Sequence, residues 1–328
     1  MSTLPDWARA LGPALFACQI RATPSDFIVD EQMDVEFSDD GEHDWLHVEK
    51  TSTNTHWLAE QLAKYAGITT RDVGYAGLKD RHAITRQWFS VRRPTGDGTD
   101  WTSFEAEGVR IVEQRLHRRK LKRGAHRGNA FRIALRADDI VQYEASIAER
   151  LAEIGTGGVP NYFGEQRFGH DGANVELGRA VVAGRRMSRN KRSIGISAVR
   201  SLDFNDELSA RVIEGTWNRI LPGDVANLDG SGSIFDVEEV TPDLEQRCAE
   251  LDIHPCGSLP VFEAIGVESG KRPLRMRVRN MKWKIDEDTL WLEFSLGRGC
   301  YATAVLREIV RQDAVSSRSG DRLTADHS

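Results

Sequence analysis

The segment with the clearest chemical character is residues 74–87, GYAGLKDRHAITRQ. It places Asp80 between Lys79 and Arg81, and its two glycines, three residues apart, permit a tight turn that approaches a ligand closely. Neighbouring cations favour the ionised form of a carboxylate, and the same cations can bind phosphate. An ionised aspartate beside phosphate-binding groups suits covalent attack on part of a nucleic acid. From these residues alone, a salt-bridged turn residue is the simpler interpretation.

A second segment, residues 123–133 with the sequence RGAHRGNAFRI, has glycines and cations directly before a predicted strand. Asn129 and Phe131 begin that strand. An amide can form hydrogen bonds with the edge of a base, and an aromatic ring can stack on its face. The alternative makes Phe131 a core residue of the strand and Asn129 a turn residue.

Three shorter segments carry aromatic residues near glycine or proline. In RATPSDFIVDE, residues 21–31, either Phe27 or Ile28 faces the core and the other is left for a groove. NYFGEQRFG, residues 161–169, is a loop that either braces a domain junction or contacts RNA. GCYATAVLRE, residues 299–308, leads from a loop into a helix, with Tyr301 where a ring can point into a cleft.

The charge distribution indicates a polyanionic partner that is held in one place. The net charge is −6, which argues against indiscriminate coating of nucleic acid. Lysine and arginine nevertheless concentrate in residues 110–127, 185–192 and 271–284. Basic segments in an acidic chain suit a bound RNA or DNA backbone. The alternative is that each run is a solvated face.

Other common chemistries lack their signatures. We find no dinucleotide-binding glycine motif, Walker lysine loop, zinc-protease motif or nucleophile-elbow serine. The four cysteines form no closely spaced pair, and no apolar run approaches the ~20 residues that cross a bilayer. The first residues lack the basic-then-apolar order of a secretion signal. We therefore expect a cytoplasmic protein without a metal, a cofactor or a membrane partner.

The elements expected to position these residues alternate between strands and helices. Apolar alternation predicts strands near 19–31, 44–50, 85–92, 131–135 and 289–295. Helical spacing and capping residues predict helices near 53–67, 139–154, 172–183, 205–220 and 302–312. The glycine-rich stretch 155–158 is the expected domain boundary.

Taken together and in their order along the chain, the five segments resemble the tRNA pseudouridine synthase D (TruD) family over residues 19–312. The resemblance implies an α/β (α+β) fold whose catalytic domain, residues 1–154 and 286–328, has a mixed, largely antiparallel central sheet. An inserted α/β TRUD domain would span residues 155–285. The nucleophile would be Asp80, and the substrate-binding residues would be Phe27, Lys79, Arg81, Asn129, Phe131 and Tyr301.

By the same resemblance, the activity would be isomerisation of uridine 13 in glutamate tRNA to pseudouridine by a monomer without a cofactor. Whether Asp80 attacks C1′ or C6 stays open. One rival hypothesis is a non-catalytic RNA-binding protein that shares the basic segments. Another is an aspartate-dependent hydrolase of small phosphorylated molecules.

Overall fold

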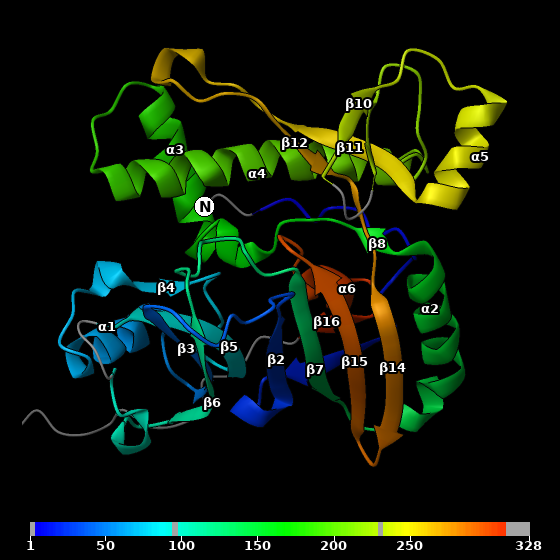
Figure 1. The fold of residues 1–328 in the computed structure, drawn as a ribbon. Coiled ribbons are helices and arrows are strands. Elements are labelled where there is room, and N and C mark those ends of the chain that lie inside the picture. The colour runs from blue at the N-terminus through cyan, green and yellow to red at the C-terminus, as the bar shows by residue number, and fades with distance from the viewer. Residues whose placement is uncertain (1–3, 94–97, 229–231, 313–328) are drawn as a thin grey trace, which may run out of the picture.

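The computed structural model describes residues 4–93, 98–228 and 232–312. Its largest feature is a mixed sheet of ten described strands, in which seven follow the order β14-β15-β7-β2-β5-β3-β6 and β1, β4 and β16 pair at its sides (Figure 1). The strands are β1 Phe16–Ile20, β2 Phe27–Gln32, β3 His43–Thr51, β4 Val73–Tyr75, β5 Ile84–Arg92, β6 Val109–His117, β7 Gly128–Arg136, β14 Arg279–Asp286, β15 Thr289–Gly297 and β16 Val310–Gln312. Two pairs, β2/β5 and β1/β16, are parallel, and the others are antiparallel. The expected mixed, largely antiparallel sheet is confirmed.

The parallel pair β2/β5 determines which loops meet. Ile28 of β2 lies opposite Ile84 of β5, so both strands begin at the same edge of the sheet. The segment before β2 contains Arg21, and the segment before β5 contains Asp80. Residues some sixty positions apart are therefore brought together by strand register, because parallel neighbours present their preceding loops on one side.

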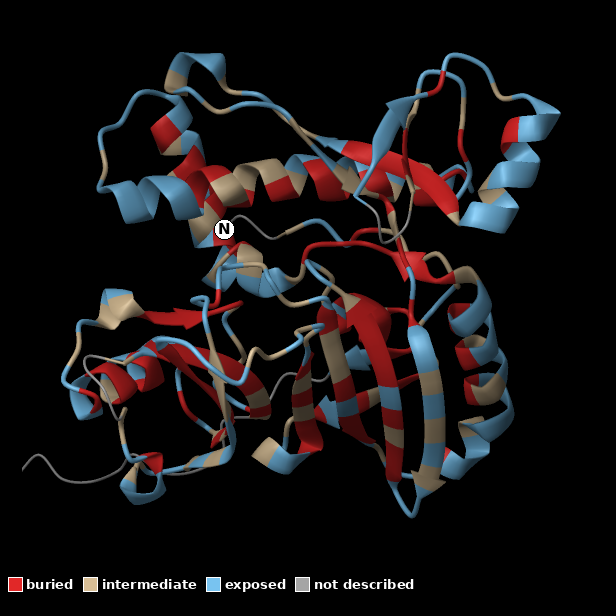
Figure 2. Cartoon of the chain, viewed as in Figure 1, coloured by how far each residue is buried: buried red, intermediate tan, exposed pale blue. Residues whose placement is uncertain are grey.

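Helices cover the sheet in two places, and each makes its own core. α1, Thr55–Tyr65, begins at Asn54, whose side chain accepts hydrogen bonds from the backbone N–H groups of His56 and Trp57. It packs its apolar face on β3, β4 and β5, where Leu46, Leu62 and Phe89 are fully buried. α2, Glu144–Gly157, and α6, Ala302–Arg307, pack with β1, β7, β14 and β15 in a larger core (Figure 2).

The remaining chain forms a second layer beyond the sheet (Figure 1). It contains α3 Ala173–Val182, α4 Arg189–Ile213, α5 Pro242–Leu251 and a four-stranded sheet of β9 Val225–Leu228, β10 Ile234–Asp236, β11 Ile253–Leu259 and β12 Gly270–Pro273. α3 and α4 approach closely at Gly178 and Gly195, where a Cβ on Gly178 would lie 2.1 Å from the Gly195 carbonyl oxygen. Phe204 and Leu208 of α4 belong to the larger core, so the two layers share one hydrophobic interior.

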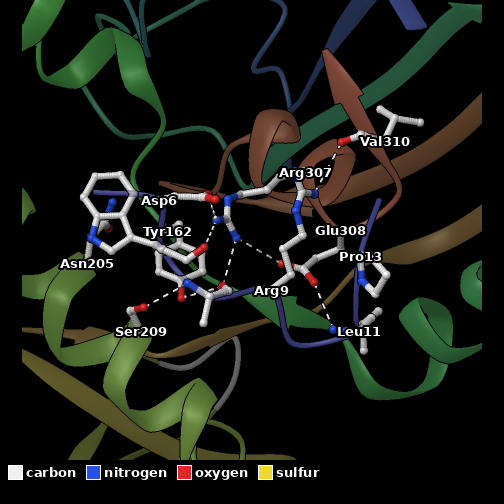
Figure 3. Close-up of polar contacts among 12 residues, drawn as sticks. Asp6, Arg9, Leu11, Pro13, Tyr162, Asn205, Ser209, Arg307, Glu308 and Val310 are labelled. Carbon is white, nitrogen blue, oxygen red and sulfur yellow. Dashed lines mark hydrogen bonds and ion pairs between the residues drawn. The ribbon is translucent and has the colours of Figure 1, made fainter. Parts of the chain in front are cut away.

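The N-terminal segment ties the two layers together (Figure 3). The Ala8 amide donates to Ser209 of α4 at 2.9 Å, and the Tyr162 hydroxyl donates to the Ala8 carbonyl at 2.9 Å. The Leu11 amide donates to the carboxylate of Glu308, which directly follows α6, at 3.1 Å. Residues 8–11 thus contact both layers through backbone hydrogen bonds, which restrict their relative movement.

The chain crosses between the layers at a short antiparallel pair, β8 Val159–Pro160 with β13 Arg275–Met276. The strand that follows, β14, pairs with β15 in the large sheet although it lies before the boundary expected after residue 285. We therefore propose that the second crossing occurs at β13. The expected first boundary at 155–158 lies at the end of α2. Residues 313–328 of the expected catalytic domain lie outside the described residues.

Two helix predictions had wrong limits, and a strand in the first basic run was missed. The helix expected near 205–220 begins at Arg189, and the helix expected over 302–312 ends at Arg307 and is followed by β16. Residues 109–117 within the first basic run form the edge strand β6, which was not predicted. The other expected helices and strands are present within a few residues of their predicted limits.

Candidate functional site

Asp80 lies in the loop between β4 and β5, residues 76–83, which we call the Asp80 loop. One carboxylate oxygen contacts the guanidinium of Arg21 at 2.6 Å, and the other accepts a hydrogen bond from the His82 amide at 3.0 Å. The side chain of Asp80 is 18% exposed. The carboxylate is therefore paired with a cation and bonded by the backbone, yet still open to a ligand on one side.

Arg21 is held in an unusual conformation. Its φ of +62° is in the left-handed region, which few residues other than glycine adopt. Its guanidinium lies 4.1 Å from the centre of the Phe27 ring while it contacts Asp80. A strained backbone at such a position persists only where surrounding contacts compensate for it, and residues of this kind cluster at functional sites. The strain and the two contacts together favour a functional role for Arg21.

Phe27 and Phe131 lie side by side beneath Arg21. Their ring centres are 6.2 Å apart in an edge-to-face arrangement, and Phe131 stacks on Phe294 of β15 at 5.4 Å. Both predicted residues are buried, Phe27 at 3% and Phe131 at 9% exposure. In the free protein both residues thus form part of the large core.

Lys79 and Arg81, on either side of Asp80, have different surroundings. The ammonium of Lys79 contacts the Glu31 carboxylate at 2.6 Å, and both side chains are almost completely buried. Arg81 is exposed, and within the described part of the chain it has no ion pair. The cation that contacts Asp80 is Arg21 rather than either sequence neighbour, so Arg81 is the one of the two that is available for phosphate.

Asn129 begins β7 opposite Glu31 of β2. Its side-chain Oδ1 is buried and has no hydrogen-bond partner among the described residues. The same is true of Nδ1 of His126, three residues earlier, where burial lowers the pKa of the imidazole. Unpaired buried polar atoms are costly in a native protein, and a bound ligand is one explanation for them. Asn129 therefore retains an acceptor for a substrate group.

Buried polar side chains beneath the Asp80 loop hold its backbone. Gln87 of β5 donates to the Gly77 carbonyl at 3.2 Å, and the hydroxyl of Thr55 donates to Gln87 at 3.1 Å. The Lys79 amide donates to the same Thr55 hydroxyl at 3.1 Å. Because Thr55 and Gln87 are almost fully buried, these bonds are shielded from water and restrict the loop strongly.

Lys50 of β3 completes this support. Its ammonium is completely buried and donates to the Thr53 carbonyl at 2.6 Å and to the Asp80 carbonyl at 3.1 Å. Burial lowers the pKa of Lys50 to about 8, while the charge of Asp80 acts in the opposite direction and that of Lys79 adds to the lowering. The ammonium thus lies directly behind the proposed nucleophile.

Tyr301 lies at the junction of the two layers. Its hydroxyl accepts a hydrogen bond from Arg167 at 2.7 Å, and its ring is 6.2 Å from that of Phe163. Arg272 lies 4.0 Å above the Phe163 ring and donates to the carbonyls of Asn161 and Gly299. We call Phe163, Arg167, Arg272 and Tyr301 the junction cluster. No described contact joins it to Asp80, so the structure brings Phe27, Phe131 and Asp80 together but leaves Tyr301 in a separate group.

The basic runs differ in how far their charges are compensated. In residues 110–127, four arginines form ion pairs with nearby acids: Arg110 with Glu49, Arg115 with Asp39, Arg118 with Asp40 and Arg127 with Asp34. In residues 185–192, no described side chain forms an ion pair, and most of the run is exposed. The positive charge of residues 185–192 is therefore less compensated than that of residues 110–127.

Sequence reasoning missed Arg21, Lys50, Arg167 and Arg272 as residues of the site. Arg21 and Arg167 were inside segments already singled out, but nothing in their spacing indicated their partners. Lys50 lies in a predicted strand, where an inward-facing lysine has no sequence signature. Among the described residues no three His, Cys, Asp or Glu side chains form a metal-binding group, and no helix has the length and hydropathy to cross a bilayer.

Comparisons with known proteins define the class. The model of the tRNA pseudouridine synthase D (TruD) family matches residues 14–188 and 257–309, and the chain therefore belongs to this family. It is similar to tRNA pseudouridine synthase D of Methylococcus capsulatus, with 41% identity, covering 94% of this chain and 95% of that protein. The protein of the same name from Pseudomonas fluorescens is also 41% identical, covering 92% and 94% respectively.

A solved structure supports the fold. The crystal structure of a tRNA pseudouridine synthase D from Methanosarcina mazei superposes with a TM-score of 0.69, covering 94% of this chain and 95% of that one. The two sequences are only 21% identical, so this similarity concerns the fold.

Proposed function

We propose that this protein isomerises a uridine of tRNA to pseudouridine, with Asp80 as the nucleophile. The observation that carries the proposal is the partly exposed carboxylate of Asp80, paired with Arg21 at 2.6 Å, in a chain that belongs to the TruD family. The family name supports the reaction, and the geometry around Asp80 supports its proposed role as the nucleophile.

The reaction breaks the N1–C1′ bond of uridine and forms a C5–C1′ bond. The proton on C5 is lost and N1 gains one, so no electron donor or group donor is consumed. Asp80 attacks either C1′ of the sugar or C6 of the base, and both routes need its ionised form. Arg21 fixes the carboxylate, while the His82 amide orients its second oxygen.

The base must leave the RNA stack before it can react, which costs a few kcal/mol. Phe27 and Phe131 offer ring edges next to Arg21, where the extruded uracil can pack. The unpaired Oδ1 of Asn129 can accept a hydrogen bond from the nucleotide. Arg81 and the two arginines of the junction cluster supply positive charge for the flanking phosphates, and the Tyr301 hydroxyl accepts a hydrogen bond from one of them, Arg167. In this arrangement Lys79 acts through Glu31, by fixing the Asp80 loop.

The finer features follow from the family resemblance. We propose uridine 13 of glutamate tRNA as the target, a cytoplasmic location, a monomeric enzyme and a reaction without a cofactor. The direct test incubates the purified protein with an unmodified glutamate tRNA transcript and maps pseudouridine by nucleoside analysis and site-specific sequencing. A transcript with cytidine at position 13 is the control. We expect modification of the first transcript only.

The main alternative is an RNA-binding protein without activity. It predicts binding of both transcripts with no pseudouridine in either. Modification at a different uridine would keep the activity and overturn only the proposed position.

A further inference from the structure

Lys50 stands out because it is a completely buried ammonium without a carboxylate partner. Its hydrogen bonds go to two backbone carbonyls, those of Thr53 and Asp80. Removing a lysine from water is costly, and buried charges are normally paired with an opposite charge. Its presence is therefore not explained by the stability of the fold.

The position of Lys50 relative to Asp80 supplies a different explanation. Lys50 lies on β3 opposite Thr85 of β5, and the Asp80 loop passes above both strands on its way into β5. The bond to the Asp80 carbonyl, at 3.1 Å, is the contact that fixes the backbone of the nucleophile itself. Gln87 and Thr55 hold the loop only at Gly77 and Lys79. Without Lys50, no side-chain hydrogen bond among the described residues would hold the backbone of Asp80.

The charges around Lys50 are few. Asp80 is the acid that raises the pKa of Lys50, and Lys79 is the cation that lowers it. Lys79 is paired with Glu31 of β2, and Asp80 is paired with Arg21 on the opposite side. The strand neighbours of Lys50, Thr85 and Val109, are uncharged. Asp80 therefore lies between two cations, with Arg21 contacting its carboxylate and Lys50 its backbone carbonyl.

We propose that Lys50 is a positioning residue for the pseudouridine reaction: its buried ammonium fixes the backbone of Asp80 and holds a positive charge behind the nucleophile. The proposal rests on the proposed function, in which Asp80 is the nucleophile. It assigns Lys50 no contact with the substrate. Loss of Lys50 should therefore slow the chemical step while leaving tRNA binding intact.

The experiment compares Lys50→Met with the wild-type protein in single-turnover reactions on tRNA, with tRNA affinity measured separately. We expect the rate constant of Lys50→Met to fall 30-fold or more and its Kd for tRNA to stay within twofold. The control is Arg211→Met, which removes a mostly buried cation from its pair with Asp224 in the second layer. It should lower the melting temperature without changing the rate constant.

A pH profile separates positioning from general destabilisation. Because the pKa of Lys50 is about 8, the wild-type protein loses this charge above that pH and Lys50→Met has none to lose. The rate constant of the wild-type protein divided by that of Lys50→Met should therefore decrease above about pH 8. Ionisation of the RNA affects both proteins equally and does not change this ratio. Should Lys50→Met fail to fold, the same test uses Lys50→Gln, which keeps an NH2 group as hydrogen-bond donor but has no charge.

Two results would overturn the inference: a rate constant within threefold of wild type, or a loss of rate matched by an equal loss of tRNA affinity. Neither affects the proposed function, which fails separately if the wild-type protein forms no pseudouridine or if Asp80→Asn retains full activity.

Discussion

The Asp80 loop and the junction cluster both combine arginines with aromatic rings, but they treat charge in opposite ways. At the loop, two cations are paired with acids: Arg21 contacts Asp80, and Lys79 contacts Glu31. In the junction cluster Arg167 and Arg272 contact rings, a hydroxyl and carbonyls, and no described carboxylate contacts either. The first region is built to fix one anion of the protein, whereas the second leaves positive charge for an anion from outside.

This difference assigns separate functions to the two regions. A fixed carboxylate favours chemistry at one atom, because its position is set before the substrate arrives. Uncompensated guanidiniums favour attraction of an RNA backbone, which depends on salt and not on sequence. Substitutions in the loop should therefore change the rate constant, and substitutions in the junction cluster should change tRNA affinity.

The largest effect in this comparison is expected for Arg21→Met. It removes the cation that contacts the Asp80 carboxylate and uncovers the Phe27 ring. We expect the single-turnover rate constant to fall on the order of 100-fold, about 2.7 kcal/mol, with little change in tRNA affinity. Arg21→Lys, which restores the charge without the planar group, should recover part of the loss. A rate constant within threefold of wild type would remove Arg21 from the site.

A second prediction concerns the pH dependence of stability. The pKa of Lys50 is about 8 in the folded protein and near the ordinary lysine value of 10.5 in the unfolded chain. Between these values the unfolded chain binds more protons, so this group makes the folded state more stable as pH rises. We expect the free energy of unfolding of the wild-type protein, minus that of Lys50→Met, to increase by about 2 kcal/mol from pH 7.5 to pH 10. Denaturant titrations at both pH values measure it, and an unchanged difference would contradict the buried charge.

Phe131 tests whether the buried rings of the site also contact the substrate. Phe131→Leu keeps most of the side-chain volume but removes the ring, and its matched control is Phe294→Leu in the ring stacked on Phe131. Loss of base stacking should slow turnover about tenfold, within the 1–3 kcal/mol typical of such contacts. The control should lower stability by a similar amount and leave turnover unchanged. Equal turnover in the two variants would show that Phe131 has only a structural role.

The smallest effect is expected in the junction cluster. Arg167→Gln removes a charge that no described acid compensates, so tRNA affinity should fall about fivefold and the salt dependence of log Kd should decrease by about one unit of slope. The rate constant at saturation should stay the same. Arg275→Gln, whose guanidinium is paired with Asp252 at 2.7 Å, is the control and should leave the salt dependence unchanged. A lower saturated rate for Arg167→Gln would contradict the division between the regions.

Local patterns predicted the parts of the fold that depend on local forces. The Asn54 cap, the α1 face and the strand β5 follow from residue types and spacing. The start of α4 was not predicted, because its first turns are charged and contain Gly195. A glycine is needed there because α3 approaches too closely to leave room for a side chain. β6 was hidden because a basic edge strand lacks the alternation of a buried one.

The candidate site shows the same limit. Asp80, Phe27 and Phe131 were named from motifs, but the pairing of Arg21 with Asp80 depends on the parallel register of β2 and β5. The position of Lys50 beneath the loop likewise results from the pairing of β3 with β5 in the same sheet. Such long-range contacts arise from tertiary structure, and no spacing in the sequence encodes them.

Asp80→Asn provides the most direct measurement. The substitution keeps the size of the side chain and the acceptor for the His82 amide, but it removes the negative charge that faces Arg21. Single-turnover assays that count pseudouridine per tRNA, with tRNA affinity measured in parallel, should show bound tRNA and no product. Product formation at the wild-type rate would contradict the assignment of Asp80 as the nucleophile.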